Sequence, residues 1–203
     1  MEHLTVEITT TEPMLGSLPG DSAIYKSYIA SKAPQPEKIV DEELAAINVD
    51  EEFQKGCTVF AKDEDGTPIL FDYVIKGFFK NACKALRESD DASCKKLSAY
   101  KTKIDNLVFV GPRKIRINTD KEITICERPL RASTAQGERV ALSASEEIAA
   151  GATMTFEITT LNKDMMKYVI EWLDYGKFNG LGQWHNSGKG RFTWVNLTDR
   201  EEK

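Results

Sequence analysis

The stretch Phe178-Asn-Gly-Leu-Gly-Gln-Trp-His-Asn-Ser-Gly-Lys-Gly-Arg-Phe-Thr-Trp194 joins a helix-like segment to a strand-like one. It combines four glycines with two basic residues and one of the two histidines of the chain: Gly180, Gly182, Gly188, Gly190, Lys189, Arg191 and His185. Glycine is used where the backbone takes positive φ or lies directly against another group. Exposed amides beside cations favour phosphate oxygens. This glycine-rich loop (residues 178–191) is therefore either a phosphate-binding loop or a connection whose glycines serve only its turns.

Hydrophobic periodicity identifies the elements on both sides of this loop. Before it, apolar residues recur at helical spacing over residues 164–175, with Asn162 as an N-cap and Met165, Val169 and Trp172 on the buried side. After it, residues 191–197 have the pattern of a strand.

The rest of the chain is predicted to be mainly strands. A helix is expected over residues 76–87, and strands over 4–10, 57–61, 68–75, 106–110, 140–144 and 154–161. Residues 114–118 and 122–126 alternate strictly around Thr119-Asp-Lys and predict a β-hairpin. This order predicts an α+β fold with a ferredoxin-like antiparallel sheet, two main helices, a β-hairpin and an N-terminal acidic insertion over residues 21–55. We expect a single domain over residues 1–203.

Basic residues stand at three further places in this pattern. Lys76 and Gly77 come where the helix is expected to begin, and a helix N-terminus offers free amides to an anion. On the hairpin, Lys114 and Arg116 alternate with isoleucines and form a basic outer side. Residues 127–137 are polar and predict a loop that exposes two arginines, Arg128 and Arg131.

Composition indicates a globular protein whose charge is unevenly distributed. The chain is 41% hydrophobic and 29% charged, and it has neither an apolar run of membrane-spanning length nor a signal-peptide pattern, so we expect a cytoplasmic protein. The four cysteines lack metal-site or disulfide spacing, and no cofactor motif is present. The net charge is −5, but residues 1–70 hold 5 Lys/Arg against 14 Asp/Glu, whereas residues 95–139 hold 11 against 5.

Three motifs, taken together and in this order, resemble the RAMP superfamily, the repeat-associated proteins of CRISPR effector complexes. They are Pro13-Met-Leu-Gly-Ser17, Asp72-Tyr-Val-Ile-Lys-Gly-Phe-Phe-Lys80 and the glycine-rich loop. The chain looks most similar to the backbone subunits that line a guide RNA, and a solitary relative encoded by a phage or mobile element fits the same resemblance. The resemblance implies an RRM-like fold and RNA-facing roles for seven residues: Lys76, Gly77, Lys80, Gly188, Lys189, Gly190 and Arg191.

Three functions are considered on this basis. The first is a non-catalytic protein that binds single-stranded or guide-like RNA, assembles head to tail and joins effector-complex proteins, with no membrane partner. The second is a docking or inhibitory (anti-CRISPR-like) relative that engages a nucleic-acid machine through its acidic surface. The third is an endoribonuclease with His185 as general acid or base. Trp184 could stack on bases, whereas Trp194 is expected in the core.

Overall fold

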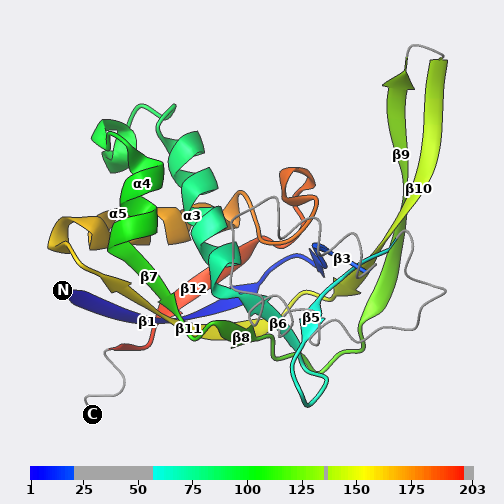
Figure 1. Ribbon diagram of the computed structural model, residues 1–203, viewed down its shortest axis with the longest axis horizontal. Helices are drawn as coiled ribbons and strands as arrows, with labels where there is room; N and C mark the ends of the chain where they lie inside the picture. Colours follow the sequence, from blue (N-terminus) through cyan, green and yellow to red (C-terminus); the bar gives the residue numbers. More distant parts are fainter. Residues whose placement is uncertain (21–56, 135–136, 199–203) are drawn as a thin grey trace, which may run out of the picture.

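The computed structural model describes residues 1–20, 57–134 and 137–198, and it gives only the backbone over 130–134 and 137–142. Its central layer is a four-stranded sheet in the order β12-β1-β11-β7 (Figure 1). The strands are β1 (Glu2–Thr10), β7 (Val108–Gly111), β11 (Thr153–Thr160) and β12 (Phe192–Asn196). Every neighbouring pair in this sheet is antiparallel.

Helices cover one face of this sheet. They are α3 (Asp72–Leu86), α4 (Tyr100–Leu107) and α5 (Lys163–Asp174), and a short 3₁₀ turn, η1 (Ser93–Lys96), precedes α4. Through this layer the chain runs β1, α3, β7, β11, α5, β12 (Figure 1). The α+β class and the antiparallel sheet are thus as predicted. None of the described helices is long and apolar enough to cross a membrane.

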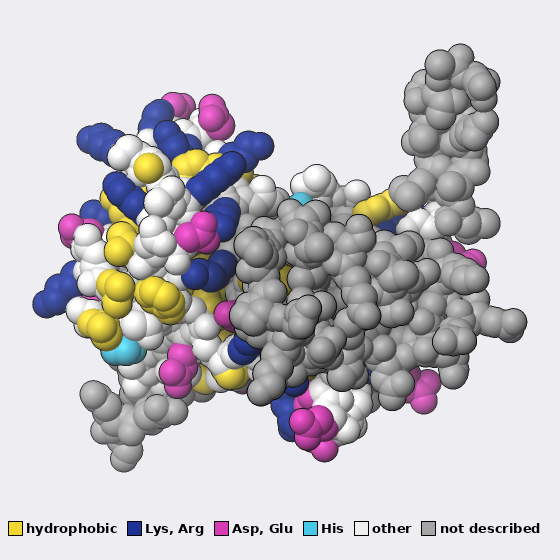
Figure 2. All heavy atoms as spheres, in the orientation of Figure 1, with side chains coloured by type: hydrophobic (Ala, Val, Ile, Leu, Met, Phe, Trp, Pro, Cys, Tyr) yellow, Lys and Arg dark blue, Asp and Glu magenta, His cyan; other side chains and the backbone are white. Residues whose placement is uncertain are grey.

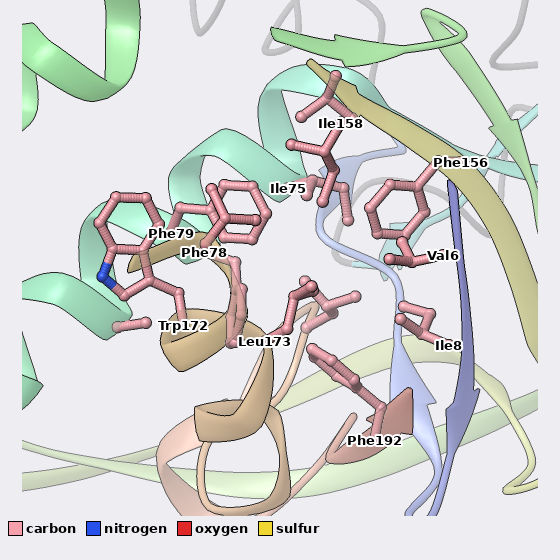
Figure 3. Packing of buried hydrophobic residues seen from close by; sticks show 14 of the residues in the cluster. Val6, Ile8, Ile75, Phe78, Phe79, Phe156, Ile158, Trp172, Leu173 and Phe192 are labelled. Atoms are coloured by element: carbon pink, nitrogen blue, oxygen red, sulfur yellow. The ribbon is translucent and has the colours of Figure 1, made fainter. Parts of the chain in front are cut away.

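The main core lies between the sheet and the helices (Figure 3). Alternation along β1 buries Leu4, Val6 and Ile8 toward the helices and leaves the intervening residues on the open face. Phe79 of α3 and Trp172 of α5 meet with their ring centroids 5.6 Å apart. The predicted cap is confirmed, since Asn162 Oδ1 accepts a hydrogen bond of 2.9 Å from the Asp164 amide.

A second, five-stranded sheet carries a long arm. It contains β2 (Met14–Leu15), β3 (Leu18–Pro19), β4 (Cys57–Val59) and β10 (Gly137–Ile148), and β9 (Thr124–Thr134) pairs with β10. Beyond the body, β9 and β10 continue as a two-stranded ribbon (Figure 1). A third sheet contains β5 (Ala61–Lys62), β6 (Pro68–Phe71) and β8 (Lys114–Arg116).

The predicted hairpin of residues 114–118 and 122–126 is wrong. β8 pairs with β6, where Leu70 lies opposite Ile115, and the true hairpin is β9 with β10. Strand alternation specifies which face is buried but not which strand is the partner. The polar residues 127–134, expected to be a loop, are strand because their backbone pairs in antiparallel register with β10, which requires no hydrophobic pattern.

The helices also differ from the prediction in two places. α3 begins at Asp72, four residues before the expected start, because Tyr73-Val-Ile75 continues the helix and buries Ile75 in the core. Core packing here outweighs the β propensity of Val and Ile. α4 was not predicted, since only Ile104 of its eight residues is buried. The expected insertion over residues 21–55 lies outside the described residues.

The cysteines allow a direct check of this packing. Cys57, Cys83 and Cys94 are buried, and burial raises their pKa, to about 12 for Cys94, whereas Cys126 on β9 is only half-buried. Because the thiolate is the reactive form, we expect native protein at mildly alkaline pH to be alkylated first at Cys126. Mass spectrometry should find a single adduct before unfolding and four after it. Early modification of Cys83 or Cys94 would contradict the packing.

Candidate nucleic-acid interface

The glycine-rich loop is held against the first motif of the chain. The Gly190 amide donates to Pro13 O at 2.8 Å, and the Gln183 amide donates to Leu15 O at 3.2 Å. Within the loop, the Leu181 amide donates to Gly190 O at 3.0 Å. Two stretches at opposite ends of the sequence therefore form one structural unit.

Close packing accounts for the glycines of this loop. Gly190 has φ +68°, and a Cβ there would overlap Leu181 O. Gly182 has φ +80°, and its Cβ would overlap Leu15 O, while a Cβ at Gly180 would overlap the backbone of Gly190. These glycines are therefore explained by the close packing and turns of the connection itself, without a ligand. The outer surface of the loop is still free to contact one.

A groove of about 140 Å³ runs between this loop and α3. It is lined by Val74, Gly77, Phe78 and Asn81 from the helix and by Gly180, Leu181, Gly182 and His185 from the loop. Gly77 is exposed, and nothing lies within 4 Å of the position that its Cβ would take. The structure thus brings together Gly77 and the glycine-rich loop, which the sequence had singled out separately.

The two lysines of the same motif do not face this groove. Lys76 Nζ donates to Asp105 O at 3.2 Å and lies 5.1 Å from the centroid of the Phe109 ring. Lys80 forms an ion pair with Asp105. Burial lowers the pKa of Lys76, although Asp105 and Asp72 oppose the shift. Lys76 also sits in the second turn of α3, so the expectation of a cation beside free helix amides is wrong.

The cations of the glycine-rich loop are also engaged within the chain. Lys189 Nζ lies 2.6 Å from Glu147 Oε2 on β10, and both side chains are largely shielded from solvent. Arg191 Nε donates to Phe178 O at 3.1 Å. Gly188 has φ +89° and is buried, and a Cβ there would contact the guanidinium of Arg191. Lys189, Arg191 and Gly188 thus make contacts that hold the loop in its conformation, and a ligand would have to compete for the two cations.

Strand β8 has the predicted alternation of buried and exposed side chains. Ile115 is buried, whereas Lys114 and Arg116 are exposed. Arg116 pairs with Asp63 at 2.7 Å and Asp65 at 2.6 Å, on the turn after β5. The acidic turn therefore offsets much of the positive charge on this strand.

Arg128 was expected on an exposed loop, and this prediction is wrong. Its side chain is 5% exposed, and its guanidinium lies 3.6 Å from the centroid of the Trp184 ring. Its Nη2 donates to Ser145 Oγ at 3.2 Å and to Gln183 Oε1 at 3.4 Å. Burial lowers the pKa of Arg128. The arginine anchors the base of the arm to the glycine-rich loop, and nothing in its local sequence indicated this.

Two other candidates remain to be placed. Arg131 lies on β9, and its side chain is outside the described part of the chain. Trp194 is partly buried against the core as expected, and its Nε1 donates to Asp174 Oδ1 at 2.9 Å. Trp184 is half-buried in the left-handed region, with φ 57°.

His185 lines the groove without a catalytic partner among the lining residues. Its Nδ1 lies 3.0 Å from Gly182 O, a contact in which the ring nitrogen donates to the carbonyl. The residues that line the groove include no carboxylate, lysine or second histidine. The only other histidine of the chain, His3, contacts Thr159 Oγ1 from β1. This setting matches a loop histidine bonded to backbone.

Comparison with known proteins yields a likeness of fold. The sequence matches no protein-family model, and no curated protein is significantly similar to it. A chain of a Type IV-B CRISPR complex aligns with 97% of this chain and 91% of its own length, with a TM-score of 0.52 and 11% identity. A chain from a cryo-EM structure of the Type III-B Cmr-beta complex bound to cognate target RNA aligns with a TM-score of 0.48 and 14% identity. That alignment covers 96% of this chain and 59% of that one.

Proposed function

We propose that this protein is a non-catalytic, RNA-binding subunit with a RAMP-like fold, belonging to a CRISPR-type ribonucleoprotein. The observation that carries the proposal is the fold shared with the Type IV-B complex chain over nearly the full length of both chains. We further infer that the layer is ferredoxin-like. The order β12-β1-β11-β7, with α3 and α5 as crossovers, is that of a split βαβ arrangement.

The groove between α3 and the glycine-rich loop is the proposed path for the RNA. It is open at Gly77, where backbone can approach a strand closely, and it lies beside Trp184 at the base of the arm. Partners of the same assembly, including other copies packed head to tail, belong to this proposal. RNA cleavage is not part of the proposal, because the residues that line the groove include no second proton-transfer group beside His185.

A second candidate, docking to a nucleic-acid machine through protein contacts, is favoured by one observation. Several cations expected to face RNA are paired with acids of the chain itself: Lys80 with Asp105, Arg116 with Asp63 and Lys189 with Glu147. These pairs leave less free positive charge along the proposed path than a basic RNA-binding surface normally has.

Asn81→Asp tests the groove with almost no change of shape. Asn81 is exposed and lines the groove, so the new carboxylate should repel a phosphate nearby by roughly 1 kcal/mol and weaken RNA binding several-fold. Fluorescence anisotropy with a labelled single-stranded RNA at low salt would measure the affinity. Asn118→Asp, which adds the same charge at an exposed position outside the groove, is the control.

Equal affinity in the wild-type protein and the Asn81→Asp variant would remove the groove as the RNA path. A wild-type protein that binds no RNA at low salt, and purifies without nucleic acid, would overturn the proposed function in favour of protein docking.

A further inference from the structure

Five lysines, four of them without an ion pair in the described part of the chain, gather on a surface that the groove does not use. This lysine patch lies where the end of α3, η1 and α4 meet, and its members are Lys84, Lys95, Lys96, Lys101 and Lys103. Figure 2 shows Lys and Arg side chains gathered over this end of the helical layer, with a few acidic side chains at its edge. Residues 80–107 contain seven Lys/Arg and four Asp/Glu.

The antiparallel packing of α3 and α4 brings lysines of both helices to the same end of the helical layer. The guanidinium of Arg87 lies 5.2 Å from the centroid of the Tyr100 ring at the start of α4, while Lys80 pairs with Asp105 near its end. Lys84 is one helical turn beyond Lys80, and Lys101 is one turn before Asp105. The helix register therefore puts an exposed lysine at the next position on each helix, and both add positive charge to the same end of the helical layer.

Two of the acids near the patch, Glu171 and Asp90, are already engaged. The carboxylate of Glu171 accepts hydrogen bonds from Ser93 N at 2.7 Å, Ser93 Oγ at 3.0 Å and Cys94 N at 3.1 Å. Asp90 is fully exposed and pairs with Lys95 at 3.6 Å. Within the described part of the chain, no ion pair involves Lys84, Lys96, Lys101 or Lys103.

The patch has charge without an apolar anchor. Residues 80–107, all of which are described, contain no exposed large hydrophobic side chain. Protein interfaces depend on buried aromatic or aliphatic anchors at their centre. Contacts to a phosphodiester backbone require only cations, and lysine serves as a flexible point charge for them.

We propose that the lysine patch binds the phosphodiester backbone of a nucleic acid without reading its sequence. The patch is formed by other residues than the groove and would hold a second stretch of nucleic acid. The chemistry is common to RNA and DNA, so single-stranded and duplex probes are needed to identify the source.

The triple variant K84Q/K96Q/K101Q tests this surface in the full-length protein. All three lysines are exposed, so the fold should be unaffected, which a thermal melt would verify. The control K163Q/K167Q/K177Q removes the same charge from exposed lysines at α5 and the turn after it. Binding of a labelled single-stranded RNA and a labelled DNA duplex is measured by anisotropy over a range of salt concentrations.

Each lost phosphate contact lowers the slope of log affinity against log salt. We expect the magnitude of the slope for the patch variant to fall by roughly 2 with single-stranded RNA, or roughly 3 with a duplex, and that of the control variant to stay near the wild-type value. A change with only one probe identifies which nucleic acid the patch holds. Slopes equal to wild type with both probes would overturn the proposal, and so would patch-dependent binding of polyglutamate as tight as that of the nucleic acids.

The two surfaces can fail independently. Asn81→Asp changes the groove and leaves the lysines in place, whereas the triple variant leaves the groove intact. Loss of RNA affinity in the first with an unchanged slope in the second would support the groove and reject the patch. The reverse pattern would support the patch and reject the groove.

Discussion

Gly190→Ala is expected to destabilise the protein by about 3 kcal/mol or more. Gly190 has φ +68°, a conformation that costs energy for alanine, and the new Cβ would overlap Leu181 O. The atoms it meets are backbone, so they cannot rotate away as a side chain would. Moving them would break the hydrogen bond from the Gly190 amide to Pro13 O.

Chemical denaturation followed by tryptophan fluorescence would measure this loss. The matched control is Gly77→Ala, which introduces the same methyl group in the interior of α3, where nothing lies within 4 Å of it. Alanine is the better helix former, so the control should gain up to about 1 kcal/mol. Similar stability in the two variants would mean that the loop is not packed as described.

Trp172→Ala is expected to lower the free energy of unfolding by about 3 to 5 kcal/mol. Trp172 is fully buried on α5, and its ring packs against Phe79 of α3 at 5.6 Å and Tyr168 at 6.3 Å between centroids. Truncation leaves a large cavity between the two helices that cover the sheet (Figure 3). The same denaturation experiment measures the effect.

Ile170→Ala provides the control on the same helix. Ile170 is 39% exposed, so its truncation removes much less buried surface than that of Trp172, and the expected loss is about 1 kcal/mol or less. A Trp172→Ala variant as stable as Ile170→Ala would place the tryptophan outside the core.

The loop is therefore part of the fold as well as the proposed interface. Lys189 forms an ion pair with Glu147, and Arg191 donates a hydrogen bond to Phe178 O. Alanine variants of these two cations would therefore change both RNA affinity and stability. Asn81 and Gly77 lie on the opposite wall of the groove and are exposed. Substitutions on the helix wall separate binding from folding more cleanly than substitutions in the loop.

Sequence periodicity predicted the elements that have one face on the core. Strand β1 and helix α5 were predicted within two residues at each end because each has one apolar side whose spacing is specific for its secondary structure. The α+β class followed from the order of these elements. The importance of the glycine-rich loop was also evident, since four glycines in so short a stretch indicate a constrained backbone.

Segments without a clear hydrophobic period were missed in part or in full. Parts of β9 and β10 were predicted as strands, over 122–126 and 140–144, but the polar residues 127–134 were expected to be a loop. Helix α4 buries a single side chain and has no strong hydrophobic period. The start of α3 was misplaced because Val74 and Ile75 favour a strand locally, while the core between α3 and the sheet stabilises the helix.

The sequence by itself determined the class of fold, the buried faces of the main elements and the need for close backbone packing at the glycines of the loop. Only the tertiary structure decided which cations remain free. Adjacent helix residues point about 100° apart, so Gly77 faces the groove while Lys76 reaches α4. Charges far apart in the chain were paired by folding, as Lys189 with Glu147, whereas Lys84 and Lys101 have no ion pair within the described part of the chain. Charge pairing depends on distances in space, and spacing along a sequence does not contain them.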